Sequence, residues 1–210
     1  MNVIKLNEKD YFCSNTYVVV ENNNAVIIDA GVGVDSINRC LKDLSNVIVR
    51  AVFLTHSHFD HILNLEKYVQ VYCCPVYVME GGKEMLRNSS LNVSKYFCQE
   101  EITYDGEVED LKDNDVVVID DLCVVAVATP GHSIDSCCYK IGQYLFTGDT
   151  IFDGSIGRLD CPTSDMSAMK NSLEKLLSLE VFEKYFAGHG RDFGFEQFIN
   201  TINESLKILI

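Results

Sequence analysis

Four side chains able to bind a metal ion lie close together at positions 56, 58, 60 and 61 of this chain. The segment reads Thr55-His56-Ser57-His58-Phe59-Asp60-His61 and follows the apolar run 51–54, which predicts a short buried strand. On a helix His56 and His58 would point to nearly opposite sides, so the segment is predicted to be a loop if both bind one ion. The spacing allows His56 and His58 to serve one ion while Asp60 and His61 serve another. Such ligands suit zinc, iron or manganese.

Length and charge limit the classes of protein that this chain can belong to. With 210 residues it fits one domain with a substantial core, and no apolar run approaches the ~20 residues needed to cross a bilayer. The first residues lack the pattern of a signal peptide, so we expect a cytoplasmic protein without a membrane partner. The net charge of −14 argues against nucleic acid as a partner, because such binding neutralises phosphates with basic residues.

The nine cysteines are odd in number and scattered, without the spacing of a disulfide framework. We expect them to be reduced and mostly buried as small apolar side chains, and not to bind metal.

Apolar and turn residues predict a mixed arrangement of strands and helices. Three hairpins are expected, joining 16–20 to 25–28, 116–119 to 122–128, and 139–141 to 144–146. Helices are expected at 35–44, 60–69, 164–177 and 196–208. Strands come in clusters with helices between and after them, which favours sheets covered by helices over a doubly wound sheet. No linker is visible, so residues 1–210 are expected to form a single domain.

Several further motifs carry a resemblance to a known family. They are Ile-Ile-Asp-Ala-Gly at 27–31, Ala-Thr-Pro-Gly-His-Ser at 128–133, Leu-Phe-Thr-Gly-Asp-Thr-Ile-Phe at 145–152, Gly-Ser-Ile-Gly-Arg at 154–158 and Ala-Gly-His-Gly at 187–190. Together with 54–61 they resemble the metallo-β-lactamase superfamily, in the same order and over roughly residues 16–198. Within it the chain resembles compact members of the glyoxalase II-like, or hydroxyacylglutathione hydrolase-like, branch.

The resemblance implies an α/β fold, a single-domain αββα sandwich with its metal site at one edge. It implies two divalent ions, zinc in the first instance and otherwise iron or manganese. All five histidines of the chain are then used. The implied ligands are His56, His58 and His132 for the first ion, Asp60, His61 and His189 for the second, and Asp149 with a hydroxide as bridges between them.

Two further residues near these motifs have two interpretations each. Asp29 is expected to orient the histidine loop, residues 55–61, without binding metal itself. An Asp before Gly31 is also typical of a turn. Arg158 is expected to meet a substrate carboxylate, or to pair with Asp160 or Asp165.

The implied chemistry is hydrolysis of a small-molecule thioester. Asp60 and Asp149 with the bridging hydroxide leave the two ions a net positive charge where an oxyanion would form. No histidine remains as a general acid, which a thiolate leaving group needs less than an amine or alkoxide does. The 21 residues after His189 are too few for the helical domain that holds glutathione in full-length glyoxalase II. We therefore expect weak glutathione recognition; the oligomeric state is not indicated.

Other activities of the same fold remain open. One is a mononuclear iron oxidoreductase related to persulfide dioxygenases, which would use a subset of the same ligands. The other is a lactonase of the same fold. A binding module without catalysis is disfavoured, because every ligand position is filled.

Overall fold

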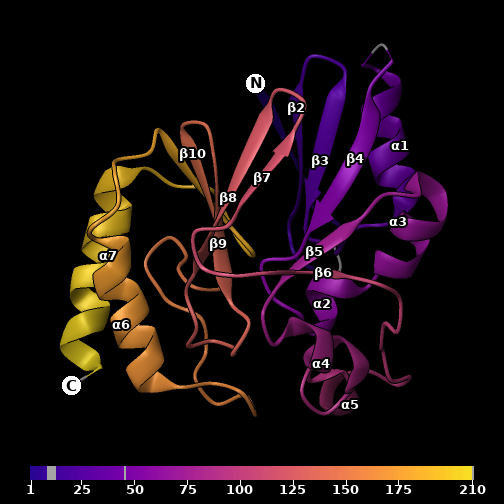
Figure 1. Ribbon diagram of the computed structural model, residues 1–210. Coiled ribbons are helices and arrows are strands. Elements are labelled where there is room, and N and C mark those ends of the chain that lie inside the picture. The colour runs from indigo at the N-terminus through magenta and orange to yellow at the C-terminus, as the bar shows by residue number, and fades with distance from the viewer. Residues whose placement is uncertain (9–12, 45, 210) are drawn as a thin grey trace.

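The computed structural model describes residues 1–8, 13–44 and 46–209 and has two facing sheets with helices on their outer sides (Figure 1). The first sheet is built from the N-terminal half of the chain. Its strands lie in the order β1 (Asn2–Leu6), β2 (Thr16–Glu21), β3 (Asn24–Ile28), β4 (Ile48–Phe53), β5 (Val76–Met79) and β6 (Glu109–Leu111). From β1 to β3 the pairing is antiparallel, and from β3 to β6 it is parallel.

The parallel strands need crossover connections, and helices supply several of them. Between β3 and β4 lies α1 (Val34–Lys42), and between β4 and β5 lie α2 (Phe59–Ile62) and α3 (Leu65–Tyr72). Between β5 and β6 lie α4 (Gly82–Arg87) and α5 (Ser94–Phe97).

The second sheet takes the C-terminal half. Its order is β11 (Lys184–Ala187), β10 (Tyr144–Gly148), β9 (Cys137–Ile141), β8 (Leu122–Ala128) and β7 (Val116–Ile119). The β10–β11 pair is parallel and the others are antiparallel. The helix α6 (Met166–Leu176) connects β10 to β11, and α7 (Phe195–Ile208) follows β11.

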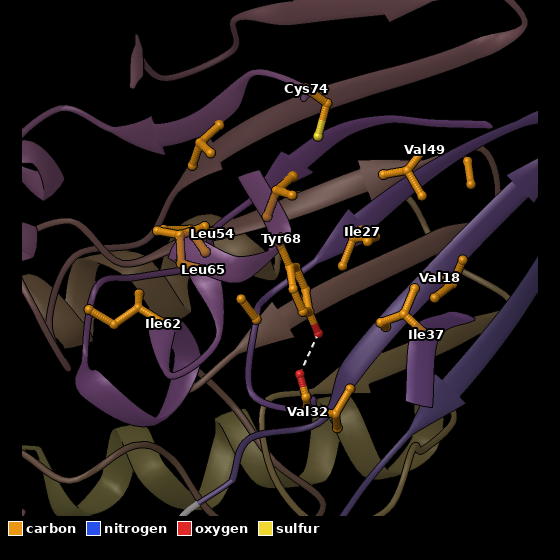
Figure 2. Packing of buried hydrophobic residues seen from close by; sticks show 14 of the residues in the cluster. Val18, Ile27, Val32, Ile37, Val49, Leu54, Ile62, Leu65, Tyr68 and Cys74 are labelled. Atoms are coloured by element: carbon orange, nitrogen blue, oxygen red, sulfur yellow. Dashed lines mark hydrogen bonds between the residues drawn. The ribbon is translucent and has the colours of Figure 1, made fainter. Parts of the chain in front are cut away.

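Alternation along β2 shows how the layers are held together. Tyr17 and Val19 belong to the core between the sheets, whereas Val18 and Val20 belong to a second core on the outer face of the first sheet. Successive side chains of a strand point to opposite faces, so a strand covered on both sides reads as a continuous apolar run. Figure 2 shows the outer core, where the hydroxyl of Tyr68 donates to the carbonyl of Val32 at 2.7 Å.

A third core lies on the outer face of the second sheet. Met169 and Leu173 of α6 and Phe198 and Ile202 of α7 are buried there. In Figure 1 these two helices and the pair α1 and α3 lie on opposite sides of the sheets. The predicted αββα sandwich in a single domain is confirmed. Among the described residues, none of the helices has the length and apolar character to cross a membrane.

The three hairpins predicted from the sequence are confirmed. The predicted single helix at 60–69 is wrong, because the chain forms α2 and α3 with a break at Asn64. Asn64 donates its backbone N–H to Ala30 and its side-chain amide to the carbonyl of Gly31, at 2.9 Å each. These bonds tie the break to the loop after β3, which local periodicity does not reveal.

The expectation for the cysteines is only partly right. Among the described residues no cysteine forms a disulfide, but only three of the nine, Cys74, Cys137 and Cys138, are buried. Cys123 is exposed because it alternates outward on β8, and Cys73 is exposed at the end of α3.

Candidate metal centre

The candidate ligands lie where strands of both sheets end. The histidine loop follows β4, Asp149 directly follows β10, and His189 lies two residues after β11. Because β10 and β11 are parallel, their carboxyl ends meet at the same edge. His132, in the loop after β8, completes the group. The loop prediction for positions 56 and 58 is confirmed, since α2 begins only at Phe59.

The first group of ligand atoms consists of three imidazole nitrogens. Nε2 of His56 lies 3.1 Å from Nδ1 of His58, which lies 2.9 Å from Nε2 of His132. All three side chains are buried. Nδ1 of His58 can carry one proton at most and therefore cannot hydrogen-bond favourably to two lone pairs at once. A cation among the three nitrogens would satisfy all of them, so this donor set fits a metal ion.

The second group combines carboxylate and imidazole. Nε2 of His189 lies 2.9 Å from Oδ2 of Asp60, and Nε2 of His61 lies 3.7 Å from the same oxygen. The ligand atoms of these three residues are close enough to share an ion.

Asp149 lies between the two groups. Its Oδ2 is 3.7 Å from Nε2 of His132 and 3.7 Å from Nε2 of His189. Its Oδ1 is 3.3 Å from Nε2 of His61. Oδ1 of Asp149 and Nε2 of His61 are buried, and neither atom makes a hydrogen bond. A buried polar atom without a partner is costly, so both atoms also fit a metal ion.

Burial and mutual charge divide the histidines into two kinds. Burial, reinforced by His61 and His58, holds the pKa of His56 well below its usual value. Burial and the neighbouring His132 lower the pKa of His58 to about 3. Burial also acts to lower the pKa of His61, but Asp29, Asp60 and Asp149 outweigh it and raise that pKa well above its usual value. His56 and His58 are thus neutral at pH 7, whereas three carboxylates surround His61.

The pKa values of the two ligand carboxyl groups are lowered. Burial would raise the pKa of Asp149, but His61 and His189 hold it well below its usual value. Burial likewise opposes ionisation of Asp60, yet His61 and His189 lower its pKa. Both side chains are therefore carboxylates at neutral pH and can act as anionic ligands.

Asp29 lies behind the histidine loop, at the place expected from the sequence. Its Oδ1 accepts the backbone N–H of Thr55 at 2.8 Å, and its Oδ2 accepts Nδ1–H of His61 at 2.8 Å. The hydroxyl of Thr55 donates to Oδ2 of Asp29 at 2.9 Å and lies 3.3 Å from Nδ1 of His56. These contacts fix the rings so that Nε2 of each faces the other candidate ligands.

His132 is oriented from the other sheet. Its Nδ1–H donates to the backbone carbonyl of Arg158 at 2.9 Å. The side chain of Arg158 forms two hydrogen bonds with Asp160, at 2.6 and 2.8 Å. Of the alternatives for Arg158, the structure thus has the Asp160 pair; Asp165 instead caps α6.

Gly188 lies beside the second group, where there is no space for a side chain. A Cβ at this position would lie 2.1 Å from Oδ1 of Asp149 and 2.7 Å from the ring of His61. Gly148 has φ of +49°, and a Cβ there would lie 2.5 Å from Oγ1 of Thr55. Any side chain at either position would displace a ligand or its support.

A pocket of about 260 Å³ opens onto the candidate ligands. Besides ligands it is lined by Phe59, Val93, Phe97, Arg158 and Cys161. Burial raises the pKa of the Cys161 thiol.

Comparison with known proteins agrees with this geometry. Residues 12–189 match the Metallo-beta-lactamase superfamily. The chain belongs to this superfamily. A curated member, the probable metallo-hydrolase YqgX of Bacillus subtilis, is 31% identical over 180 residues, which cover 84% of this chain and 85% of that protein.

Solved structures of the superfamily are similar over nearly the whole chain. The BLEG-1 B3 metallo-beta-lactamase is 28% identical with a TM-score of 0.86, covering 95% of this chain and 97% of that one. TTHA1623, solved in a di-iron-bound form, is 25% identical with a TM-score of 0.80, covering 96% and 98%. The chain is therefore a member of a metallo-hydrolase family with a His and Asp cluster suited to divalent metal.

Some residues of this superfamily site were not singled out by the sequence. Thr55 precedes the first histidine and could have been noticed, since a hydroxyl beside a ligand is a common support. Val93, Phe97 and Cys161 carry no local signal, because only the tertiary fold brings them to the pocket.

Proposed function

We propose that this chain is a dinuclear metal-dependent hydrolase that cleaves small-molecule thioesters, of the hydroxyacylglutathione hydrolase type. The observation that carries the proposal is the convergence of five histidines and two aspartates in two groups with Asp149 between them. The family supports a metal-dependent hydrolase, and the arrangement of the pocket supports the choice of substrate.

Each group would hold one divalent ion. His56, His58 and His132 would hold the first, and Asp60, His61 and His189 the second, with Asp149 reaching both. Zinc suits these ligands, as do iron and manganese. When bound, such ions lower the pKa of water toward ~7 and polarise a carbonyl.

The protein's own residues set the conditions for that chemistry. Asp29 and Thr55 hold the ligand rings in one orientation, and the carbonyl of Arg158 does so for His132. Asp60 and Asp149 supply the anionic charge. Burial of His56, His58, His61 and His132 limits the access of bulk water to their ligand atoms.

The lack of a general acid for the leaving group supports a thioester as the substrate. All five histidines lie in the ligand groups, so none remains to protonate a departing amine or alkoxide. Among the described residues around the pocket, Arg158 is paired with Asp160, and the Cys161 thiol is a weak acid because burial raises its pKa. A thiolate, whose conjugate acid has a pKa of about 8.5, leaves without such help.

Metal analysis together with a substrate panel tests the proposal. Metal-replete protein is expected to hold two transition-metal ions per chain. The panel pairs a lactoyl thioester with its oxygen ester and amide, and adds a lactone and a β-lactam, the latter because BLEG-1 is similar. We expect kcat/KM for the thioester to exceed that for the oxygen ester by about 10²–10⁴-fold, the usual contribution of a general acid.

Other outcomes would identify the alternatives. A single tightly held iron that His189→Ala leaves unchanged, with oxygen consumed on a persulfide, would replace the hydrolase by an oxygenase. Faster cleavage of the lactone or oxygen ester would replace the thioesterase by a lactonase or esterase.

A further inference from the structure

One wall of the pocket is apolar and begins directly beside the histidine loop. Phe59 follows His58 in the chain, and its ring stacks on Phe97 with centroids 6.0 Å apart and an interplanar angle of 17°. Phe97 belongs to the short helix α5 and remains 46% exposed, although it is a large aromatic side chain. Candidate ligands also line the pocket. A bound molecule would thus meet both the ligand atoms and the aromatic rings.

The wall is held in an unfavourable backbone conformation. Val93, which directly precedes α5 and lines the pocket, has φ of +61°, in the left-handed region that β-branched residues avoid. Conformations of this kind persist where the surrounding structure enforces them, and they cluster at functional sites.

Asn92 enforces the conformation of Val93. Its side-chain oxygen accepts the backbone N–H of Ser94 at 3.0 Å, and its amide donates to the carbonyl of Ile102 at 2.7 Å. Its own carbonyl accepts the backbone N–H of Phe59 at 3.0 Å. The strained turn is thereby joined to the metal-binding loop, and the wall keeps a fixed position relative to the ligands.

Arg158 also lines the pocket, but its positive charge is paired. Its guanidinium lies 5.7 Å from the centroid of the Phe97 ring and is paired with Asp160 through two hydrogen bonds. A carboxylate on the substrate would have to compete with Asp160. Arg158 therefore adds no unpaired positive charge beside the apolar side chains of Phe59, Val93 and Phe97.

We propose that Phe59, Val93 and Phe97 form the acyl-binding site and that Phe97 determines specificity for apolar acyl groups. This rests on the proposed thioesterase function, but it changes the preferred acyl group from a hydroxyacyl group to that of a short aliphatic or aryl acid. At about 260 Å³ the pocket is smaller than typical sites for whole ligands, so it suits one part of the substrate.

The thiol carrier has a separate place. A second pocket of about 470 Å³ also reaches His189 and is lined by Phe152, Asp153, Ser155 and Arg191. It is larger than the first pocket, and Asp153, Ser155 and Arg191 supply polar side chains that suit the polar carrier of a biological thioester. Hydrolysis then breaks the bond between the acyl carbon and sulfur and forms a bond to the oxygen of water, giving the acid and the thiol.

The test uses acetyl, butanoyl, hexanoyl and lactoyl thioesters of one small thiol, N-acetylcysteamine, with metal-replete protein. For the wild type, kcat/KM is expected to rise from acetyl to hexanoyl and to be higher for butanoyl than for lactoyl. Phe97→Ala is expected to lose about 10-fold or more on hexanoyl, mainly through KM, with little change on acetyl. Phe97→Leu should restore most of the preference.

Tyr96→Ala is the matched control, since Tyr96 lies on the same helix, is 60% exposed and does not line the pocket. Equal effects of Tyr96→Ala and Phe97→Ala, or an equal loss by Phe97→Ala on every acyl group, would overturn the inference while leaving the thioesterase intact.

A binding measurement separates the inference from the proposed function. Calorimetric titration with acetate, butanoate and hexanoate should show tighter binding with chain length in the wild type and not in Phe97→Ala. If no thioester is cleaved but this dependence is found, the thioesterase fails and the apolar site stands. If neither binding nor turnover depends on chain length, the acyl site is wrong.

Discussion

At the scale of single residues, Asp149 and Asp60 are carboxylates with different reach. Asp149 lies within 3.7 Å of nitrogens from both ligand groups, whereas the contacts of Asp60 are with His61 and His189 of one group. We expect Asp149→Ala to cost more activity than Asp60→Ala, because it removes ligand atoms from both groups and the constraint on their separation. Metal content and kcat/KM of both variants check this.

A protein with Asp149→Ala that keeps wild-type activity and metal content would refute the placement of Asp149 between two ions. Circular dichroism of both variants controls for loss of the fold.

Gly188 offers a second test at this scale, by adding a single carbon atom. Gly188→Ala places a methyl group against Asp149 and His61, so we expect bound metal to fall and activity to drop by about 10–100-fold, as when ligand support is disturbed. Gly33→Ala is the control, since its new carbon would meet only Oε1 of Glu8, at 3.4 Å. Elemental analysis measures the bound metal. Unchanged metal content in Gly188→Ala would show that the absence of a side chain at this position is not required.

At the scale of elements, the start of α6 is defined by one side chain. Oδ1 of Asp165 accepts the backbone N–H of Ala168 at 2.8 Å, and the backbone N–H of Asp165 donates to the carbonyl of Gly131, next to His132. Asp165→Ala should lower the free energy of unfolding by about 1 kcal/mol, as is usual for a lost N-cap. Urea unfolding measures this. Asp160→Ala, which breaks a solvent-exposed pair, should leave the midpoint unchanged.

Elements with strong local patterns were predictable and those formed by tertiary contact were not. The hairpin β2–β3 has β-branched runs around an Asn-rich turn, so its existence follows from local residues. The strand β11 has only four residues and pairs in parallel with β10, across the whole of α6. Nothing within Lys184–Ala187 specifies that partner. The break at Asn64 was missed for the same reason.

The candidate site divides in the same way. Its ligands could be named because each lies in a motif that resembles a family, and the structure brings them together. The wall formed by Val93 and Phe97 could not be named, because tertiary contacts bring α5 to the pocket, among them the hydrogen bonds of Asn92 and the stacking of Phe59 on Phe97.

At the scale of the whole molecule, one buried carboxyl makes stability depend on pH. Asp135 is 1% exposed, accepts the hydroxyl of Ser133 at 2.7 Å through Oδ1, and has no partner for Oδ2. Burial raises its pKa above the usual 3.8. The folded state therefore keeps the proton to a higher pH than the unfolded chain, and stability is lost as pH rises through the folded pKa.

Asp135→Asn cannot lose that proton. Relative to the wild type, its unfolding free energy should therefore increase between pH ~4 and pH ~7. Urea midpoints of both metal-replete proteins at the two pH values measure the difference, and a difference that does not change with pH would contradict the assignment.

The position of the ligands at the ends of strands from both sheets gives a bound ion a mechanical role. The histidine loop follows β4 in the first sheet, and Asp149 and His189 follow β10 and β11 in the second. An ion bound by these residues would therefore link the two halves of the chain. A link of this kind closes a long loop, and the stability gained by the folded state grows with the logarithm of the metal concentration divided by the dissociation constant. After chelation, amide hydrogen exchange should accelerate at residues 147–150 and 187–190. The exchange rate should change little in β7, at the far edge of the second sheet, because loss of the ion allows local opening only near the ligands.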